Sequence, residues 1–257
     1  MASEYTPGEM MVAAAAREID DGDTAFVGMR LPLLAFQVAV ETHAPNALAI
    51  YESGVIRDTP AERFIHTMCD LPNIDGAVAT TGMSAIMERL QRGEVDVGFL
   101  GGAEIDRYGN LNTTRVRADG ADVRLPGSGG GCDIAALSGR TVLILPHEPR
   151  RFVEEVNYVT SPGHTENDAA RGDYATPGGG PETLVTSKAT FGFDDTGELY
   201  LRSVHPGVDA ADIADDFSWT LKTADDVGDG EVTTTPEPSQ EALTLVRRFD
   251  PDGFWTG

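Results

Sequence analysis

The chain has 257 residues, of which 42 are Asp or Glu and 19 are Lys or Arg, giving a formal net charge of -23. A chain this acidic lacks the basic surface that nucleic acids and anionic membranes require, so both classes of partner are excluded. Its length and even composition predict one large α/β domain over residues 1–257 with a sizeable core.

The basic residues are almost all arginine, because Lys188 and Lys222 are the only lysines. Carboxylates spread along a chain hold water and ions at the surface, and salt screens their mutual repulsion. We therefore interpret the composition as halophilic, that of a protein from a high-salt cytoplasm. The alternative interpretation is an ordinary acidic enzyme.

Cysteine and histidine are sparse and give no metal-binding pattern. Cys69 and Cys132 are too few for a disulfide framework or a zinc site, and the histidines lack ligand spacing, so we predict no metal. The first residues do not form a basic leader with an apolar core, and the apolar runs fall short of the roughly 20 residues of a membrane helix. We expect a cytoplasmic protein.

In the first part of the chain, short apolar strands alternate with helices. The Thr6-Pro7-Gly8-Glu9 segment predicts a capping box that opens a helix ending before Gly22. We then expect helices over 33–44 and 83–93, and strands over 24–28, 47–51, 76–80, 95–102 and 140–146. This alternation is typical of an open, mostly parallel sheet with helices on both faces.

The last part of the chain has a different character. Residues 161–182 are rich in Gly, Pro and polar side chains and predict a long surface loop. Residues 184–204 predict a C-terminal β-hairpin extension that turns at 194–197. Residues 225–240 predict an acidic linker within the domain, before a short helix over 241–249.

An acid, Glu52, directly follows the strand predicted over 47–51. In open α/β sheets, ligands collect at the carboxyl ends of the strands. Ser53 and Gly54 permit a tight turn, so the Glu52 carboxylate can point into a crevice. The competing interpretation is that Glu52 caps a helix or pairs with Arg57, and position alone favours it.

A glycine-rich loop over 126–139 leads into a short helix, and its backbone N–H groups can converge on a phosphate or an oxyanion. The candidate donors are Gly127, Ser128, Gly129, Gly130 and Gly131. A dinucleotide fingerprint does not fit, since Cys132 stands at its third glycine and 121–126 is a poor strand; a P-loop ending is absent as well. We interpret Cys132 as a small filler rather than a nucleophile.

The segment over 99–114 leaves a strand through two glycines and then packs polar residues closely together. Such a loop either scaffolds the strand ends or contacts the substrate. The residues that we expect to support the site are Ser53, Gly54, Gly101, Gly102, Asn110 and Asn112.

Four segments carry a resemblance, in this order and at this spacing: YESGVI, FLGGAEIDRYGNLNTT, GSGGGCDIA and LPHEPRRFVEEVNYVTSPG. Together they resemble the B subunit of the glutaconate CoA-transferases, which are family I CoA-transferases. The likeness runs from about residue 6 to residue 163. Beyond that point the chain departs from the family in length and composition, in the region expected to bear on acid specificity.

The resemblance implies a hetero-oligomer with a CoA-transferase A subunit that moves CoA between an acyl-CoA and a carboxylic acid. It implies that Glu52 is the catalytic glutamate, that the 127–131 loop binds the thioester oxyanion, and that CoA is a substrate with no other cofactor. The chemistry is consistent with this, because a carboxylate is ionised at pH 7 and attacks a thioester without help from histidine or metal. Two alternatives remain: a CoA-thioester or ring-opening hydrolase on the same fold, and a non-catalytic regulatory or binding subunit.

Overall fold

A computed structural model describes residues 5–118, 120–164 and 177–257. The chain forms two compact units, one of residues 1–99 with 237–257 and one of residues 100–236. The prediction of a single domain over 1–257 stays a prediction. The stretch 225–240, predicted as an acidic linker, contains a short strand, Thr233–Thr234. The boundary between the two units, between residues 236 and 237, also falls within the stretch 225–240.

The first unit is built on five strands in the order β5-β1-β2-β3-β4. Strands β5, β1 and β2 run parallel, whereas β3 and β4 are added in antiparallel fashion. The strands are β1 (Thr24–Phe26), β2 (Leu48–Ile50), β3 (Val55–Arg57), β4 (Ala79–Thr80) and β5 (Val97–Leu100), which ends at the boundary between the units. The helices are α1 (Pro7–Ala16), α2 (Leu31–Glu41), α3 (Leu71–Ile74), α4 (Met83–Gln91) and α8 (Gln240–Phe249).

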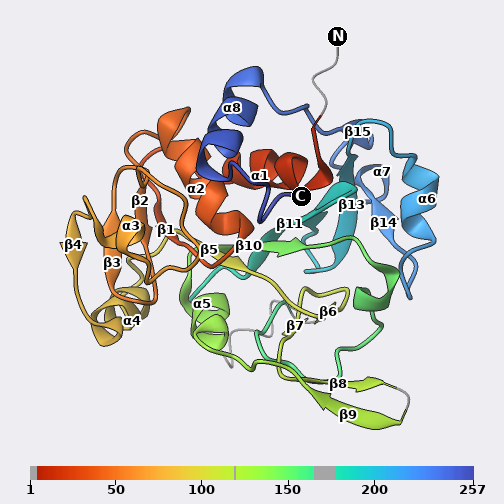
Figure 1. The fold of residues 1–257 in the computed structure, drawn as a ribbon. Helices are drawn as coiled ribbons and strands as arrows, with labels where there is room; N and C mark the ends of the chain where they lie inside the picture. Colours follow the sequence, from red (N-terminus) through yellow and green to blue (C-terminus); the bar gives the residue numbers. More distant parts are fainter. Residues whose placement is uncertain (1–4, 119, 165–176) are drawn as a thin grey trace. The chain divides into compact units, whose positions relative to one another are not determined.

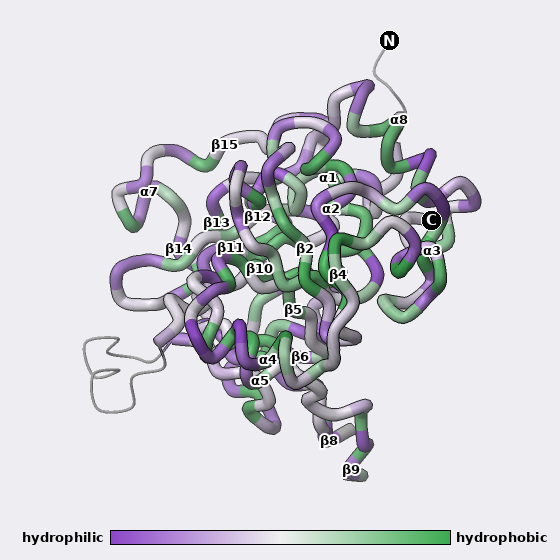
Figure 2. The backbone as a smooth tube through the Cα atoms, turned by 90° about the vertical axis from the view of Figure 1, so that its left-hand side faces the viewer, coloured by the Kyte–Doolittle hydropathy of each residue, from purple (hydrophilic) through white to green (hydrophobic). Residues whose placement is uncertain are grey.

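Helices α1, α2 and α8 pack against one another, although α8 comes from the far end of the chain (Figure 1). The predicted capping box starts α1: the Thr6 Oγ1 atom accepts from the Glu9 N–H at 3.1 Å, and Glu9 Oε2 accepts from the Thr6 N–H at 2.8 Å. Nearly every residue of α1 and α2 is buried, and both helices are predominantly hydrophobic in Figure 2. Arg247 of α8 donates to the buried Glu9 at 2.6 Å, which ties α8 to α1.

The second unit contains strands in the order β14-β13-β12-β11-β10, with β15 also paired to β13. These are β10 (Arg140–Leu145), β11 (Pro181–Thr186), β12 (Ala189–Phe193), β13 (Leu199–Val204), β14 (Lys222–Thr223) and β15 (Thr233–Thr234). Two separate hairpins are β6 (Glu104–Ile105) with β7 (Leu111–Asn112), and β8 (Arg115–Ala118) with β9 (Ala121–Arg124). The helices are α5 (Gly131–Leu137), the 3₁₀ turn η1 (Pro149–Arg151), α6 (Ala210–Ala214) and α7 (Ala224–Val227).

The sequence predictions in this unit have three outcomes. The hairpin predicted over 184–204 is confirmed as β12 and β13, which pair antiparallel and turn through Asp194–Gly197. The long loop predicted over 161–182 lies in large part outside the described residues, which resume at residue 177. The interpretation of 121–126 as a poor strand was wrong for residues 121–124, which form β9 and pair with β8 along their whole length. Every residue of β9 is exposed, so the strand lacks the apolar run of a buried strand.

Candidate active site

Glu52 lies in the tight turn that joins β2 to β3. The turn is closed by two hydrogen bonds, from the Gly54 N–H to the Tyr51 carbonyl at 2.8 Å and from the Tyr51 N–H to the Val55 carbonyl at 3.0 Å. The turn follows the carboxyl end of β2, which runs parallel to β1. Tyr51, the residue before Glu52, is 1% exposed, while Glu52 and Ser53 are half-buried. The backbone that carries the Glu52 side chain is therefore anchored in the core. The predicted strand, acid and tight turn are therefore all present.

Gly54 makes this turn possible for two reasons. Its φ angle is +102°, a conformation that favours glycine, and a Cβ atom at this position would overlap the carbonyl of Thr81. The close approach is held by hydrogen bonds from Thr81 N–H and Thr81 Oγ1 to the Gly54 carbonyl, at 2.8 and 3.1 Å. Ser53 anchors the other side, because its Oγ donates to the Met68 carbonyl at 3.1 Å. Both predicted supporting residues hold the turn itself.

Arg57 does not pair with Glu52. Its guanidinium is buried and donates to backbone carbonyls only, at Thr59, Pro60, Pro72, Asn73 and Asp75 over 2.6–3.3 Å. Within the described residues, the Glu52 carboxylate makes no hydrogen bond or ion pair. The competing interpretation of Glu52 as a helix cap or as the ion-pair partner of Arg57 is therefore wrong.

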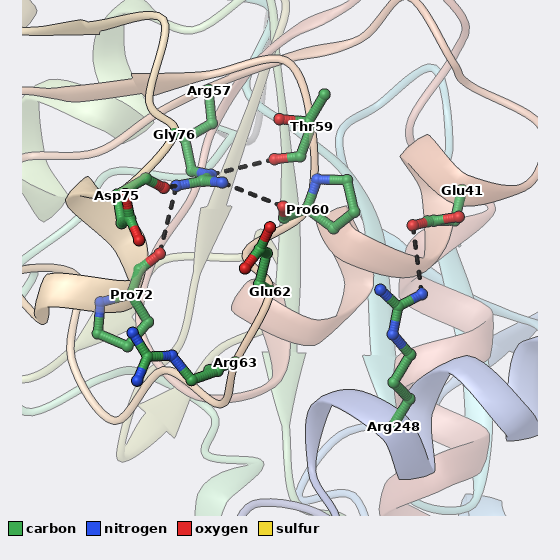
Figure 3. Close-up of a pocket in the computed structure, with 10 residues that line it drawn as sticks. All are labelled: Glu41, Arg57, Thr59, Pro60, Glu62, Arg63, Pro72, Asp75, Gly76 and Arg248. Atoms are coloured by element: carbon green, nitrogen blue, oxygen red, sulfur yellow. Dashed lines mark hydrogen bonds and ion pairs between the residues drawn. The ribbon is translucent and has the colours of Figure 1, made fainter.

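Beside Arg57 lies a cavity of about 370 Å³ that the sequence did not predict (Figure 3). It is lined by Glu41, Arg57, Thr59, Pro60, Glu62, Arg63, Pro72, Asp75, Gly76 and Arg248. Arginines and acids balance there, and Arg248 pairs with Glu41 at 3.5 Å. Residues whose backbone carbonyls accept from Arg57 line part of this cavity. Backbone carbonyls are common to all residue types, so no sequence pattern predicts a cavity of this kind.

The glycine loop belongs to the second unit and leads into α5, as predicted. Its first residue is fixed by a pair of bonds with Thr113: the Gly127 N–H donates to the Thr113 carbonyl, and Thr113 Oγ1 donates to the Gly127 carbonyl, both at 2.8 Å. Its end is fixed by the Gly131 N–H, which donates to the Ser128 carbonyl at 2.9 Å. The loop is therefore anchored at both ends.

Between those anchors, the N–H groups of Ser128, Gly129 and Gly130 donate to no atom of the described residues. Gly127 and Gly129 have φ angles of +105° and +51°, with open space where a Cβ would stand. Successive N–H groups without acceptors in a glycine-rich loop can serve as donors to an anion. Cys132 follows the loop and is exposed, so its interpretation as a small filler was wrong.

The remaining predicted residues stabilise the β6–β7 hairpin. Buried Glu104 accepts from Asn112 Nδ2 at 2.7 Å, and Asp106 accepts from Asn110 Nδ2 at 2.9 Å. Burial raises the pKa of Asp106 above its usual value, against the lowering effect of its hydrogen bonds. The strand leaves through Gly101 and Gly102, where a Cβ would lie 3.1 Å from the carbonyls of Ile144 and Glu104 respectively. This geometry is that of scaffolding.

The structure thus brings the predicted residues together in two groups. Glu52, Ser53 and Gly54 share one turn of the first unit. In the second unit, the 127–131 loop joins Thr113 directly after β7, next to the hairpin that holds Asn110 and Asn112. Each group is compact and is fixed by main-chain hydrogen bonds.

Comparison with known proteins identifies the family, since the model for "Coenzyme A transferase" matches residues 8–216. The chain belongs to the coenzyme A transferase family. It is 35% identical to the B subunit of 3-oxoadipate CoA-transferase from Pseudomonas knackmussii, over 96% of this chain and 94% of the relative. It is 34% identical to the B subunit of glutaconate CoA-transferase from Acidaminococcus fermentans, over 97% of this chain and 94% of the relative. The resemblance to the B subunit of a family I CoA-transferase is confirmed.

The fold comparison agrees. The crystal structure of glutaconate CoA-transferase from Acidaminococcus fermentans matches with a TM-score of 0.87 over 99% of both chains, at 28% identity. The decarboxylase AibA/AibB matches with a TM-score of 0.81 over 98% of this chain and 97% of that one, at 27% identity. The predicted class, a mostly parallel sheet with helices, is confirmed together with its antiparallel additions.

These relatives make the chain a CoA-transferase of the B-subunit type, and their subunit names imply a complex of more than one kind of chain. Among the described residues, no helix is both long enough and apolar enough to cross a membrane. Nor does any group of three or more His, Cys, Asp or Glu side chains among them form a candidate metal site.

Proposed function

We propose that this chain, together with a CoA-transferase A subunit, transfers CoA from an acyl-CoA to a carboxylic acid through a glutamyl-CoA thioester at Glu52. The observation that carries the proposal is the Glu52 carboxylate: it is half-buried in a rigid turn at a strand end, and no hydrogen bond or ion pair engages it among the described residues. A carboxylate that caps a helix or pairs with Arg57 would be a poor nucleophile, because its oxygen lone pairs would be engaged. The Glu52 carboxylate has no such partner among the described residues and is available as a nucleophile.

The reaction is a sequence of acyl substitutions. The Glu52 carboxylate attacks the thioester carbonyl and expels CoA thiolate, which leaves a mixed anhydride. The thiolate then attacks the glutamyl carbonyl of that anhydride, forming glutamyl-CoA and releasing the donor acid as its carboxylate. The acceptor carboxylate then attacks the carbonyl of glutamyl-CoA and expels CoA thiolate, which gives a second mixed anhydride. The thiolate attacks the acceptor carbonyl of this anhydride, forming the acceptor acyl-CoA and releasing the Glu52 carboxylate.

Each substitution passes through a tetrahedral oxyanion. The N–H groups of Ser128, Gly129 and Gly130 donate to no atom of the described residues, which supports their proposed role as donors to that oxyanion. Each such donor contributes about 3 kcal/mol to transition-state stabilisation in related oxyanion holes. In the second unit, Gly127 and Gly131 hold the ends of this loop, and Gly101, Gly102, Asn110 and Asn112 hold the neighbouring backbone. In the first unit, Ser53 and Gly54 hold the turn that carries Glu52.

The two curated relatives are named for 3-oxoadipate and glutaconate, which are both dicarboxylic acids. We extend this to a dicarboxylic acid as one substrate here. The rival function is hydrolysis of a CoA thioester, in which water replaces the acceptor acid. A cytoplasmic location and a halophilic origin stay predictions.

The test uses the chain alone and mixed with its A subunit. Initial rates of acyl-CoA consumption are measured with and without a dicarboxylic acceptor. A transferase requires both the partner and the acceptor, whereas full consumption without acceptor would establish a hydrolase, and full turnover by the isolated chain would refute the two-subunit proposal. Glu52→Gln should abolish transfer, and Glu88→Gln, at an exposed residue of α4 paired with Arg92, should leave it unchanged.

A further inference from the structure

The β8–β9 hairpin forms an arm that projects from the rest of the second unit (Figures 1 and 2). Its strands pair through Arg115↔Arg124, Val116↔Val123 and Arg117↔Asp122. Because side chains alternate between the faces of a strand, Arg115, Arg117, Asp122 and Arg124 share one face, hereafter the arginine face. Three arginines on one short face are conspicuous in a chain with 19 basic and 42 acidic residues.

Two of these arginines are placed unfavourably for a hairpin on its own. Arg115 and Arg124 stand directly opposite each other, and like charges at such a cross-strand pair are destabilising. An isolated two-stranded hairpin has little stability to spare. Folding of the arm therefore does not account for this pair.

Neither arginine of that pair is neutralised within the described residues. Arg117 pairs with Asp122 at 3.3 Å, but the side chain of Arg124 makes no ion pair or hydrogen bond and is exposed. Arg115 lies over the ring of Tyr158, with its Cζ 5.5 Å from the ring centre, and Tyr158 is itself 43% exposed. The arginine face thus offers unpaired guanidinium groups next to an exposed aromatic ring.

The base of the arm is held rigidly and connects directly to the glycine loop. The Leu125 N–H donates to the Thr114 carbonyl at 2.9 Å, and Asn112 Nδ2 donates to the Arg115 carbonyl at 2.6 Å. Beyond the arm, Gly127 exchanges hydrogen bonds with Thr113, the residue before Thr114. Arg124 and Gly127 are three residues apart in the sequence, so their Cα atoms lie at most roughly 10 Å apart.

We propose that the arginine face of the β8–β9 arm, with Tyr158 beside it, binds the phosphate groups of the nucleotide part of coenzyme A. This inference rests on the proposed function, in which the glycine loop holds the thioester end of the same molecule. Guanidinium groups bind phosphate oxygens with two parallel charge-assisted hydrogen bonds, and an anion between Arg115 and Arg124 removes their repulsion. The long pantetheine arm of CoA separates its thioester from its phosphates, so two distinct subsites are needed.

The test compares two substrates in the complex with the A subunit: acyl-CoA and the matching acyl-pantetheine, which has no phosphates. For the Arg115→Gln/Arg124→Gln enzyme, we expect the KM for acyl-CoA to rise at least about tenfold with kcat unchanged, given the usual strength of hydrogen bonds to charged groups. The kinetics with acyl-pantetheine should not change. Arg92→Gln, which removes an exposed arginine paired with Glu88, is the matched control.

An unchanged KM for acyl-CoA would overturn the inference. So would equal losses with both substrates, or loss of the A subunit in size-exclusion chromatography, since these would make the arm a docking element for an acidic partner. Calorimetric binding of adenosine 3′,5′-bisphosphate to the complex separates this inference from the proposed function. Binding that the double variant weakens about tenfold would support the arm even if no acyl-CoA reacted, and an active enzyme with unaltered bisphosphate binding would reject the arm alone.

Discussion

At the scale of single residues, the tight turn at Glu52 leaves its carboxylate without a hydrogen bond or ion pair among the described residues. The neighbouring cation, Arg57, is fully engaged by carbonyl oxygens, so it does not neutralise Glu52. The sequence indicated the strand end, the acid and the turn residues, because all three are local properties. Arg57 was misjudged because its acceptors at Pro72, Asn73 and Asp75 are brought to it by tertiary structure.

Gly54 offers a test of this turn. Gly54→Ala should lower the free energy of unfolding by roughly 3 kcal/mol, because the positive φ angle and the overlap with the Thr81 carbonyl add together. Gly22→Ala is the matched control, since its φ angle is +93° but a Cβ there meets nothing within 4 Å, and it should cost about 1 kcal/mol. Urea unfolding of both variants measures the difference, and equal losses would contradict the close approach at Gly54.

At the scale of elements, Arg57 connects β3 to the segment that carries α3. Arg57→Met keeps most of the side-chain volume but leaves five carbonyl groups without their donor, so we expect a loss of stability of about 3 kcal/mol or more. Arg63→Met is the control, because Arg63 is exposed and makes no ion pair within the described part of the chain. Denaturant midpoints that shift equally in both variants would mean that the Arg57 bonds contribute little.

His147 lies just beyond the end of β10, packed against Phe152 and bonded to Thr186 Oγ1 at 2.9 Å. Burial lowers its pKa to about 4, helped by Lys188 and opposed by Asp216, whose Oδ2 is 3.2 Å from Nε2. The unfolded chain therefore binds more protons between about pH 6.5 and about 4, so stability falls as the pH drops through this window. The loss is at most about 1.4 kcal/mol per pH unit.

The measurement is the pH dependence of urea unfolding for wild type and His147→Phe, since phenylalanine keeps a ring among Phe152, Phe191 and Phe217 without titrating. Comparing the two curves removes the contribution of the carboxylates. Parallel curves for wild type and His147→Phe would show that the pKa of His147 is not lowered.

Among the elements, those with an apolar run or a cap were predictable. α1 follows its capping box, and α8 begins at Ser239, whose Oγ accepts from the Ala242 N–H at 3.0 Å. The β8–β9 hairpin was missed, although an Asp-Gly pair between two alternating segments is a strong hairpin signal. Every residue of β9 is exposed, so this strand lacks the apolar run that marks a buried strand in a sequence.

At the scale of the whole molecule, the excess of negative charge should govern stability. Repulsion among carboxylates is screened within about 10 Å at 0.1 M salt, but over roughly 30 Å at 0.01 M. We therefore expect the chain, with its net charge of -23, to lose stability as potassium chloride falls from molar to millimolar concentration. Urea unfolding followed by circular dichroism tests this, and equal stability at all salt concentrations would favour the ordinary acidic enzyme.

The division into two units, in contrast, had no signal in the sequence. The last 21 residues, 237–257, belong with residues 1–99, and this return of the chain depends on long-range contacts such as Glu9 with Arg247. The strand end at Glu52 and the glycine loop over 127–131 could each be indicated by the sequence because each is a local pattern. Local sequence patterns and composition indicate local structure and net charge, but they do not indicate which segments distant in the sequence pack together.

The central claim is that Glu52 carries CoA, and trapping the intermediate tests it most directly. The assembled enzyme is incubated with acyl-CoA without acceptor acid, reduced with borohydride, digested and analysed by mass spectrometry. We predict that the peptide containing Glu52 has its carboxyl group reduced to an alcohol, as expected of a thioester, and that Glu52→Ala enzyme gives no such product. A thioester or disulfide at Cys132, or CoA exchange by Glu52→Ala near the wild-type rate, would contradict the account.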